Sequence, residues 1–518
     1  MEELSFFLRR ALWGLFLLLI MGGALLGTVG NLDHLSYIAA FIFACAMVLC
    51  LLFGKRDKDR NGMVLAGETA ECQNHRTGEK NKASDRQCAG KEAAILALLC
   101  LVINGGFVLL FHPIQAPDYQ TFLEAAENLA AGIQPRNHAY LAMFPHILGY
   151  AAFLSLFLRL FGGGILTASL VNAGLTALSC IAVYKLGKFA GGRKAGRIAA
   201  LLWIFCPSKM LFNTMSLSEP YYTCLLLFFF LLLIYLDRRY SDPDYSAGIN
   251  ESYRRNGKLC AFMCSGLCGG VLLALINTAR PIGIIPIIAL ALWILLLRRG
   301  YSGVSYWLIL IVVMISVYTV IGALWRDYEN RILGEEPAGI PGYSICVGFN
   351  METGGSYADE DMELLQSRYF GEDNGSAPQA QRYMLDLAKA RIIENGKALP
   401  RLMLMKLGTL LGHDEAGAFY AKESLTPRVY SLLCIFCNVW YYCLCLLAMP
   451  ACVHYSRRGE RGTILLLPLF AVGLILAQLL VEVAARYHYA LIPILTLLAA
   501  LSLSLPDRFN TRMREGKS

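Results

Sequence analysis

The chain has 518 residues, of which 56% are hydrophobic and 16% are charged, and its mean hydropathy is +0.50. This composition excludes a single soluble domain, because one soluble core cannot bury so much apolar surface. The net charge of +8 does not indicate a nucleic-acid partner, since the basic residues lie in short loops between apolar runs, where they orient a membrane protein. The sequence therefore predicts an all-α polytopic integral membrane protein, with the bilayer as its solvent.

The 17 cysteines do not indicate a disulfide framework, because most of them lie inside apolar runs and behave there as small hydrophobic residues. Cys434 and Cys437, and likewise Cys443 and Cys445, lack the His or acidic companions that a zinc site needs in the same run. We therefore expect no metal site and no cofactor, although the sequence leaves a dependence on a divalent metal open.

In chain order, residues 1–54 contain two apolar runs and predict an N-terminal transmembrane hairpin. Residues 55–91 carry nine Lys or Arg and predict a polar cytoplasmic loop. The apolar run at 92–111 then exports the chain, so residues 112–139 are expected to form the first extracytoplasmic loop. This hairpin and loop precede the main group of membrane spans.

Residues 92–325 form the predicted transmembrane core. Three apolar runs lie between residues 140 and 213, but three full crossings would put the basic residues of 185–197 on the outside. We expect one of the three to be a broken or re-entrant helix, with Pro145 and Pro207 as candidate break points, because proline removes a helix hydrogen bond. The chain then has about 12 transmembrane helices (11 to 13) and both termini inside.

Residues 326–427 predict an extracytoplasmic region with amphipathic helices, followed by C-terminal transmembrane helices at 428–505 and a cytoplasmic tail at 506–518. The segment 343–370 is rich in Gly, aromatic and acidic residues, as acceptor-binding loops often are. Its acids could instead begin a solvated helix, which we favour. The stretch LPRLMLMKLGTLLG is expected to lie along the outer membrane surface.

Asp118 is the candidate catalytic residue of the first extracytoplasmic loop. It lies a few residues beyond an exported helix, at the depth of the lipid headgroups, and Tyr119 follows it. A carboxylate there can accept a proton from an acceptor nucleophile. Asp118 could equally be the N-cap of a helix that starts at Tyr119, since Asp is a favoured N-cap residue.

Glu219 is the second candidate acid, in the segment CPSKMLFNTMSLSEPYY, directly before Pro220 and a long apolar run. Acids at the edge of a membrane span are costly unless they are paired or hydrated, and they are therefore often functional. The alternative is helix-start chemistry, because an acid and a proline both suit the first turn of a helix.

The third candidate feature is the C-terminal segment VEVAARYHYALIPIL at an outward-facing helix boundary. Arginine offers a rigid fork of donors that suits phosphate, although an arginine at a membrane boundary commonly just extends to the interface. Arg280 in NTARPIG and His146 in FPHILGY are similar, weaker cases. The polar residues of the C-terminal segment are Glu482, Arg486, Tyr487 and His488.

The order of these segments over roughly residues 92–505 resembles the GT-C glycosyltransferases. The resemblance is closest to the group of protein O-mannosyltransferases and aminoarabinose transferases (family 39), and the FP and CPSKMLFNTMSLSEPYY segments are also similar to PIG-V mannosyltransferases. The resemblance implies an inverting transferase that moves a sugar, such as a mannose-like hexose, from a polyprenyl-phosphate donor to a lipid, glycan or protein acceptor on the extracytoplasmic side.

The resemblance also implies roles for individual residues. Two departures from the family pattern concern the donor phosphate: the first loop has a lone Asp118 where many relatives have paired acids, and the lysine found in that loop in aminoarabinose transferases is absent. The implied catalytic acids are Asp118 and Glu219, the implied donor or phosphate ligands are Arg486, Tyr487, Arg280 and His138, and the implied acceptor contacts are Tyr119 and His146.

A transporter or lipid flippase is the main alternative, because it too would be polytopic with a few charges in the membrane. Transporters usually show inverted repeats and broken helices near the midplane. The two halves of this sequence show no convincing repeat, and the candidate charges lie at the outward boundary. The glycosyltransferase interpretation is therefore preferred.

Overall fold

The computed structural model describes residues 2–30, 36–49, 78–241, 251–297, 304–371, 375–459 and 462–504. Within these ranges the regular structure is entirely helical, which confirms the predicted fold class. Eight helices are long and apolar enough to cross a membrane, while the predicted total of about 12 crossings stays a prediction. These helices are α1 (Glu2–Gly30), α3 (Gly78–Leu110), α7 (Ile165–Ile204), α9 (Glu219–Ser241), α10 (Glu251–Ala279), α12 (Val304–Leu333), α18 (Pro427–Arg458) and η5 with α20 (Ala485–Leu491, Ile492–Ser504).

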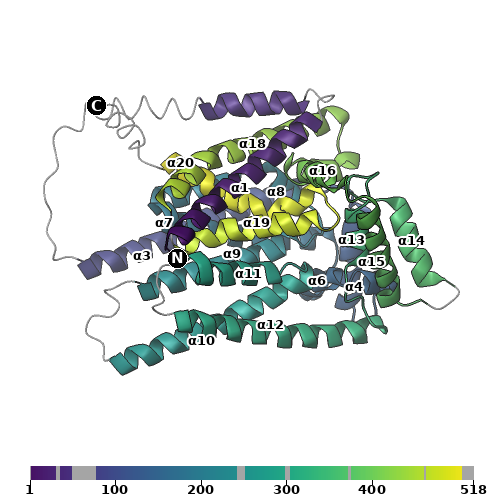
Figure 1. Ribbon diagram of the computed structural model, residues 1–518, viewed down its shortest axis with the longest axis horizontal. Helices are drawn as coiled ribbons and strands as arrows, with labels where there is room; N and C mark the ends of the chain where they lie inside the picture. Colours follow the sequence, from purple (N-terminus) through teal and green to yellow (C-terminus); the bar gives the residue numbers. More distant parts are fainter. Residues whose placement is uncertain are drawn as a thin grey trace.

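Shorter helices complete the bundle and form a cap at one of its ends (Figure 1). Four apolar ones are Ser36–Leu49, α6 (His146–Phe161), α11 with η2 (Ile284–Leu292, Trp293–Leu297) and η4 with α19 (Thr463–Leu465, Leu466–Leu479). The others are α4 (Pro117–Ala130), α5 (His138–Met143), α8 (Pro207–Phe212), α13 (Gly342–Gly348), α14 (Asp359–Phe370), α15 (Ala377–Glu394), α16 (Leu399–Leu411), α17 (Ala416–Tyr420) and η3 (Lys422–Ser424).

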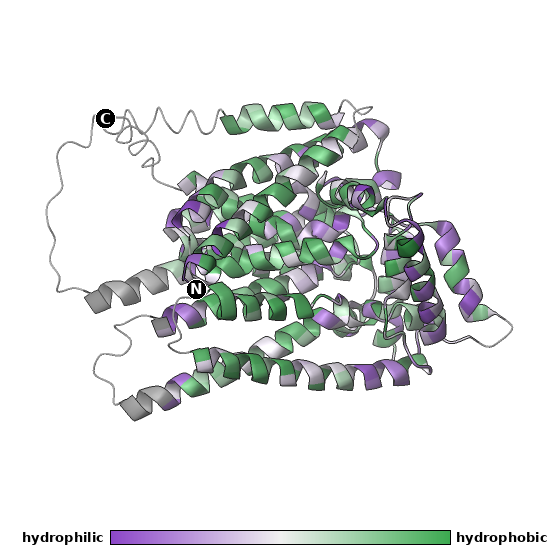
Figure 2. Ribbon diagram, in the orientation of Figure 1, coloured by the Kyte–Doolittle hydropathy of each residue, from purple (hydrophilic) through white to green (hydrophobic). Residues whose placement is uncertain are grey.

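The arrangement separates apolar from polar structure. The long helices run side by side, and α13, α14 and α15 gather at the right-hand end in Figure 1. Figure 2 shows mainly hydrophobic residues along the long helices and many hydrophilic residues on α14 and α15. A bundle of this kind suits a bilayer, because each helix satisfies its own backbone hydrogen bonds in the apolar phase.

Parts of the predicted cytoplasmic segments lie outside the described residues. The predicted tail at 506–518 is wholly outside them, and the predicted loop at 55–91 is described only from Gly78. From that residue the chain is already helical, because α3 begins there and continues to Leu110. The helix therefore starts earlier than the apolar run at 92–111 indicates.

Helix α7 is a hairpin of two segments. The backbone leaves helical geometry at Gly191 (φ −140°) and Gly192 (φ +81°), and the positive φ at Gly192 suits a residue without a Cβ. The two halves then pack together, since a Cβ on Gly187 would lie 2.9 Å from the Cα of Gly196. The basic residues of 185–197 therefore surround a turn, as the sequence predicts for a loop.

Helix α6 packs along α4, which lies in the segment 112–139. The Arg159 guanidinium, near the end of α6, donates from Nη2 to the Leu129 carbonyl oxygen at 2.6 Å and from Nε to that of Ala130 at 3.1 Å. Nearer its start, Tyr150 has its ring centroid 5.8 Å from that of Phe122 on α4. Both ends of α6 therefore lie beside α4, while the expected re-entrant helix stays a prediction.

The two prolines predicted as break points lie at helix boundaries. Pro145 is the N-cap residue of α6, directly after α5 ends. Pro207 begins α8 after the chain leaves helical geometry at Phe205 and Cys206. Proline suits the first turn of a helix, because its missing N–H would have no partner there.

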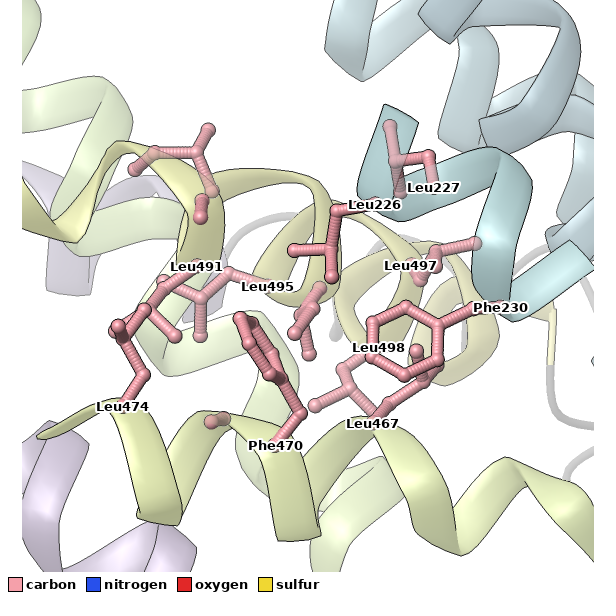
Figure 3. Packing of buried hydrophobic residues seen from close by; sticks show 14 of the residues in the cluster. Leu226, Leu227, Phe230, Leu467, Phe470, Leu474, Leu491, Leu495, Leu497 and Leu498 are labelled. Carbon is pink, nitrogen blue, oxygen red and sulfur yellow. The ribbon is translucent and has the colours of Figure 1, made fainter. Parts of the chain in front are cut away.

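A leucine-rich core fixes the C-terminal helices that carry the RYH segment (Figure 3). Phe230 on α9 and Phe470 on α19 have ring centroids 5.4 Å apart. Leu491 at the end of η5 and apolar side chains of α20 fill the space beside them, so the junction of η5 and α20 is held in place. The labelled residues of this core are Leu226, Leu227, Phe230, Leu467, Phe470, Leu474, Leu491, Leu495, Leu497 and Leu498.

The first helix is an integral part of the bundle. Arg9 is buried and donates to the carbonyl oxygens of Gly459, at 3.1 Å, and Leu297, at 3.2 Å, which end α18 and η2. Toward the other end of α1, a Cβ on Gly27 would lie 2.2 Å from the Cα of Gly412, directly after α16. Helix α1 therefore joins one end of the bundle to the other.

Candidate active site

Four segments distant in the sequence bring the predicted acids and arginines together. Asp118 comes from α4, Glu219 from the first residue of α9, Arg280 from the end of α10, and Arg486 from η5. Arg486 Nη2 lies 2.9 Å from Asp118 Oδ2, and Arg280 Nη2 lies 2.6 Å from Glu219 Oε1. The structure therefore assembles two neighbouring acid–arginine pairs from residues that the sequence singled out.

Asp118 is an accessible carboxylate. The N-cap of α4 is Ala116, followed by Pro117, so the alternative that Asp118 is the N-cap is wrong. The Asp118 side chain is 49% exposed, whereas its partner Arg486 is 13% exposed. One side of the Asp118 carboxylate is therefore open to a substrate, while Arg486 binds the other side of the same carboxylate.

Arg486 lies in an aromatic enclosure. Its Cζ atom lies 5.6, 5.4 and 5.5 Å from the ring centroids of Tyr119, Tyr420 and Tyr487, and Nη1 donates to the Tyr119 hydroxyl oxygen at 3.3 Å. Arg486 Nε is buried and has no hydrogen-bond partner in the described part of the chain. A guanidinium held by rings with a donor still unused suits binding of an anionic oxygen.

Tyr487 links this arginine to the second pair. The Cζ of Arg280 lies 5.1 Å from the Tyr487 ring centroid, and Arg280 Nε is also buried without a hydrogen-bond partner among the described residues. Glu219 is fully buried, so its carboxylate depends on Arg280 for compensation. Two guanidinium groups flanking one tyrosine are well suited to a phosphate group.

The remaining predicted residues divide into two sets. Tyr119 is buried against Arg486, and His146 lies within electrostatic range of Arg280, Arg486 and Asp118. His138, in contrast, is exposed at the start of α5, and no hydrogen bond or ion pair joins it to the site among the described residues. The structure therefore brings Tyr119 and His146 into the site and leaves His138 outside it.

Lys406 on α16 is a residue of the site that the sequence did not single out. Its side chain is fully buried, and Nζ donates to the carbonyl oxygens of Gly348 at 2.8 Å, Leu479 at 2.8 Å and Val481 at 2.6 Å. Burial lowers the pKa of Lys406 to about 8, while the nearby Glu482 acts in the opposite direction. The only sequence signal for Lys406 is a cation within an apolar stretch. This pattern is also typical of the polar face of an amphipathic helix, so it does not single out a site residue.

Glu482 stands three residues before η5 and also belongs to the site. Burial raises the pKa of its carboxyl group, and Arg486 opposes this shift. Burial also raises the pKa of Tyr119 and of Tyr420, which share contact with Arg486. These neutral phenols leave the arginine as the cation of the enclosure.

A buried polar network supports η5 from the side of α8 and α16. His488 Nδ1 lies 2.7 Å from the Leu410 carbonyl oxygen, and Nε2 lies 3.2 Å from Asp414 Oδ1. Ser208 donates to the same carboxylate oxygen at 2.8 Å. Because His488 follows Arg486 and Tyr487 directly, this network fixes the backbone that presents both residues.

The acidic run at the start of α14 is largely a helix start, as favoured from the sequence. Asp359 and Glu360 lie in the first turn, whereas Asp361 is buried and pairs with Arg391 at 2.7 Å. In the described ranges no group of three or more His, Cys, Asp or Glu is arranged to hold a metal ion. The acids of α14 therefore offer no metal centre within those ranges.

Comparison with known proteins connects the chain to membrane glycosyltransferases. Residues 145–247 match the family model of dolichyl-phosphate-mannose-protein mannosyltransferases. A comparison with curated proteins gave no match. The matched segment includes the start of α6 and the segment that ends in Glu219, so the family signal covers part of the site.

Solved structures of low sequence identity are also similar. Archaeal oligosaccharyltransferase AglB from Archaeoglobus fulgidus, in complex with an inhibitory peptide and a dolichol-phosphate, has 12% identity and a TM-score of 0.44, covering 81% of this chain and 50% of that one. ArnT from Cupriavidus metallidurans bound to undecaprenyl phosphate has 14% identity and a TM-score of 0.36, covering 77% and 78%. This chain thus spans about half the length of the archaeal protein.

The family-model match is the finding that bears on the predicted class. It covers residues 145–247, well under half of the chain, and includes two predicted site residues, His146 and Glu219. The match confirms the predicted resemblance of this all-helical membrane protein to the GT-C superfamily of membrane glycosyltransferases.

Proposed function

We propose that this protein transfers a sugar from a polyprenyl-phosphate donor to an acceptor on the extracytoplasmic side of the membrane. The observation that carries the proposal is the half-exposed Asp118 carboxylate paired with Arg486, with Arg280 on the other side of Tyr487. Each of the two arginines keeps a buried donor unused. The family-model match supports the reaction class, and its description suggests a mannose-like hexose as the sugar.

The chemistry needs one base and cationic partners for the leaving phosphate. The Asp118 carboxylate accepts the proton of the acceptor hydroxyl, whose oxygen attacks the anomeric carbon of the donor sugar. The bond from that carbon to the phosphate oxygen breaks, and the phosphate leaves with the electron pair. Arg280 and Arg486 stabilise its charge, so the reaction as written needs no nucleotide or metal.

The pairing of Asp118 with Arg486 suggests how binding of the donor frees the Asp118 carboxylate to act as the base. A donor phosphate at the two arginines competes with the Asp118 carboxylate for the Arg486 fork, because one guanidinium has a limited set of donors. Glu219 keeps its implied role in catalysis as a proposal. Its burial against Arg280 supports a contribution through the position and charge of that arginine.

The sidedness of the site follows from the distribution of charge. Helix α9 begins at Glu219 in the site and ends with Arg238 and Arg239 in its last turn. The basic turn of the α7 hairpin likewise lies a helix length away from the start of that hairpin. Because basic residues stay in the cytoplasm, the end of the bundle that carries Asp118 is placed outside in this proposal.

The test is sugar transfer in proteoliposomes with a set of polyprenyl-phosphate sugars. Asp118→Asn should lower the transfer rate by about 10²-fold or more, since a general base contributes about that much. Glu127→Gln, an exposed carboxylate on the same helix, is the matched control and should transfer at the parent rate.

Each outcome of this test separates the candidate functions. Transfer that is lost in Asp118→Asn and kept in Glu127→Gln supports both the reaction and the base. Transfer activity that does not depend on Asp118 would support the proposed glycosyltransferase activity but would contradict the role of Asp118 as the base. No transfer with any donor would overturn the proposal and favour a transporter or lipid flippase.

A further inference from the structure

Glu482 lies in a short segment between α19 and η5 whose backbone is held from several sides. Its N–H donates to the Ser344 carbonyl oxygen at 2.6 Å, and the N–H of Val483 donates to that of Gly355 at 2.9 Å. Lys406 binds the carbonyl oxygen of Val481, the residue on the other side. With its backbone fixed in this way, Glu482 presents its side chain from a rigid position.

The Glu482 carboxylate makes no contact that stabilises the fold within the described ranges. It has no hydrogen-bond or ion-pair partner within the described ranges, and it remains partly accessible. Its electrostatic neighbours are Arg486, Asp118, Arg280 and Lys406. A half-buried carboxylate without a partner is costly, so a ligand that donates hydrogen bonds to it would remove that cost.

Tyr343 on α13 offers a second unused group at the same place. Its side chain is 2% exposed, and its hydroxyl is buried without a hydrogen-bond partner among the described residues. Glu482 is the first electrostatic neighbour of this hydroxyl, followed by Tyr357 and Tyr140. Because the Glu482 N–H donates to the carbonyl oxygen of Ser344, the residue after Tyr343, these two unpartnered groups come from adjoining segments and indicate a site for a polar ligand.

Aromatic rings give this site a wall. Tyr140 and Phe144 have ring centroids 4.8 Å apart, and Phe144 and Tyr343 have centroids 5.4 Å apart. Such a surface suits the apolar face of a sugar ring, while the hydroxyl groups of the sugar need acceptors at their edges. Tyr140 of this wall and Glu482 both lie within electrostatic range of Asp118.

We propose that Glu482 and Tyr343 form the subsite that binds the hydroxyl groups of the transferred sugar. This inference rests on the proposed function, because Arg280 and Arg486 are taken as the phosphate end of the same donor. The donor then extends from the two arginines past Asp118, with its anomeric carbon near that base and its hydroxyl groups at Glu482 and Tyr343.

The charges favour a neutral sugar over an amino sugar. Three of the four electrostatic neighbours of Glu482 are cations, namely Arg486, Arg280 and Lys406. An ammonium group placed at Glu482 would meet these cations, whereas a hydroxyl group can donate to the carboxylate without repulsion. The subsite is therefore assigned to an uncharged hexose.

The experiment measures binding of two lipids to the full-length protein: undecaprenyl phosphate, and the same lipid carrying mannose. The variants are Glu482→Gln and Tyr343→Phe, and the matched control is Asp386→Asn, an exposed acid on α15. We expect Glu482→Gln to weaken binding of the mannosylated lipid about tenfold, since it replaces a charged acceptor with a neutral one. Undecaprenyl phosphate should bind the parent and all variants alike, which also shows that they are folded.

A series of mannosylated lipids that each lack one hydroxyl group identifies the contact. The parent should discriminate against at least one of them, and Glu482→Gln should lose that discrimination for the same sugar. Two results would overturn the subsite alone. In the first, the parent and the variants bind the mannosylated lipid equally. In the second, the parent binds the mannosylated lipid no more tightly than it binds undecaprenyl phosphate. A parent that binds neither lipid would overturn the proposed function instead.

Discussion

Lys406 should make the site sensitive to pH, because its amine loses one N–H donor when it is deprotonated. An ammonium group has three N–H donors, and all three meet a carbonyl oxygen, one from Gly348, one from Leu479 and one from Val481. Burial lowers the pKa of Lys406 to about 8. Above that pH the amine has one donor too few, and the segment that carries Glu482 loses a support. We expect the transfer rate to fall as the pH rises through about 8.

The stability of the protein should respond in the opposite sense. The pKa of Lys406 in the fold lies below the ordinary value of 10.5, so the unfolded chain binds more protons between the two values. The contribution of this lysine to the free energy of unfolding therefore rises with pH over that interval. Rate and melting temperature against pH, for the parent and Lys406→Met, check both trends. An inflection in the rate that persists unchanged in Lys406→Met would contradict the assignment.

The sequence identifies the charged residues at the membrane boundary better than those in the exported region. Asp118, Glu219 and Arg486 stand out because a charge at the edge of a membrane span is costly unless it is paired or hydrated, and is therefore often functional. Lys406 and Tyr343 carry no such signal, since packing of the exported helices alone decides that they are buried. His138 was assigned from the resemblance alone, and the structure leaves it exposed outside the site.

At the scale of elements, the close approach of α1 and α16 depends on glycine. A Cβ on Gly27 would lie 2.2 Å from the Cα of Gly412, whereas a Cβ on Gly22, in the same helix, would meet nothing within 4 Å. Gly27→Val should therefore push α16 away and destabilise the fold by about 1–3 kcal/mol, while Gly22→Val should leave the packing intact. Because α16 carries Lys406, Gly27→Val should also lower the transfer rate.

The melting temperature in detergent and the transfer rate measure this effect. The two variants change the same residue type in the same helix, so the intrinsic cost of valine in a helix is matched. A melting temperature that is equal in Gly27→Val and Gly22→Val would show that α1 is not packed against α16. That result would contradict the conclusion that α1 is an integral part of the bundle.

The apolar runs predict where helices form, because a long run without charge has no other way to satisfy its backbone in a membrane. They do not predict how helices pair. The apolar residues on the two sides of the basic segment 185–197 become one hairpin, α7, in which Gly187 and Gly196 are small enough for the two halves to touch. Glycines within an apolar run fit several packings equally, so the sequence alone does not select this one.

At the scale of the whole molecule, α6 decides the direction of every later helix. Phe144, just before α6, packs against Tyr343, and α6 ends beside α4, so we expect the chain to leave α6 on the side of the membrane where it entered. The exported cap, the site and the start of α7 then share one end of the bundle. The basic turn at Gly191 and Gly192 lies at the opposite end, in agreement with the retention of basic residues in the cytoplasm.

Reporter domains inserted after His138, Gly163, Gly192 and Asn213 test this arrangement directly. We expect the reporters after His138, Gly163 and Asn213 to be extracytoplasmic and the reporter after Gly192 to be cytoplasmic. The reason is that α6 returns to α4, whereas the two halves of α7 run in opposite directions. Each insertion lies at a helix boundary or turn, and transfer activity shows which fusions keep the native fold. Alternation at every step, with Gly163 inside and Gly192 outside, would mean that α6 crosses the membrane. Asp118 and Glu219 would then lie on opposite sides of the membrane, which would contradict the single site described above.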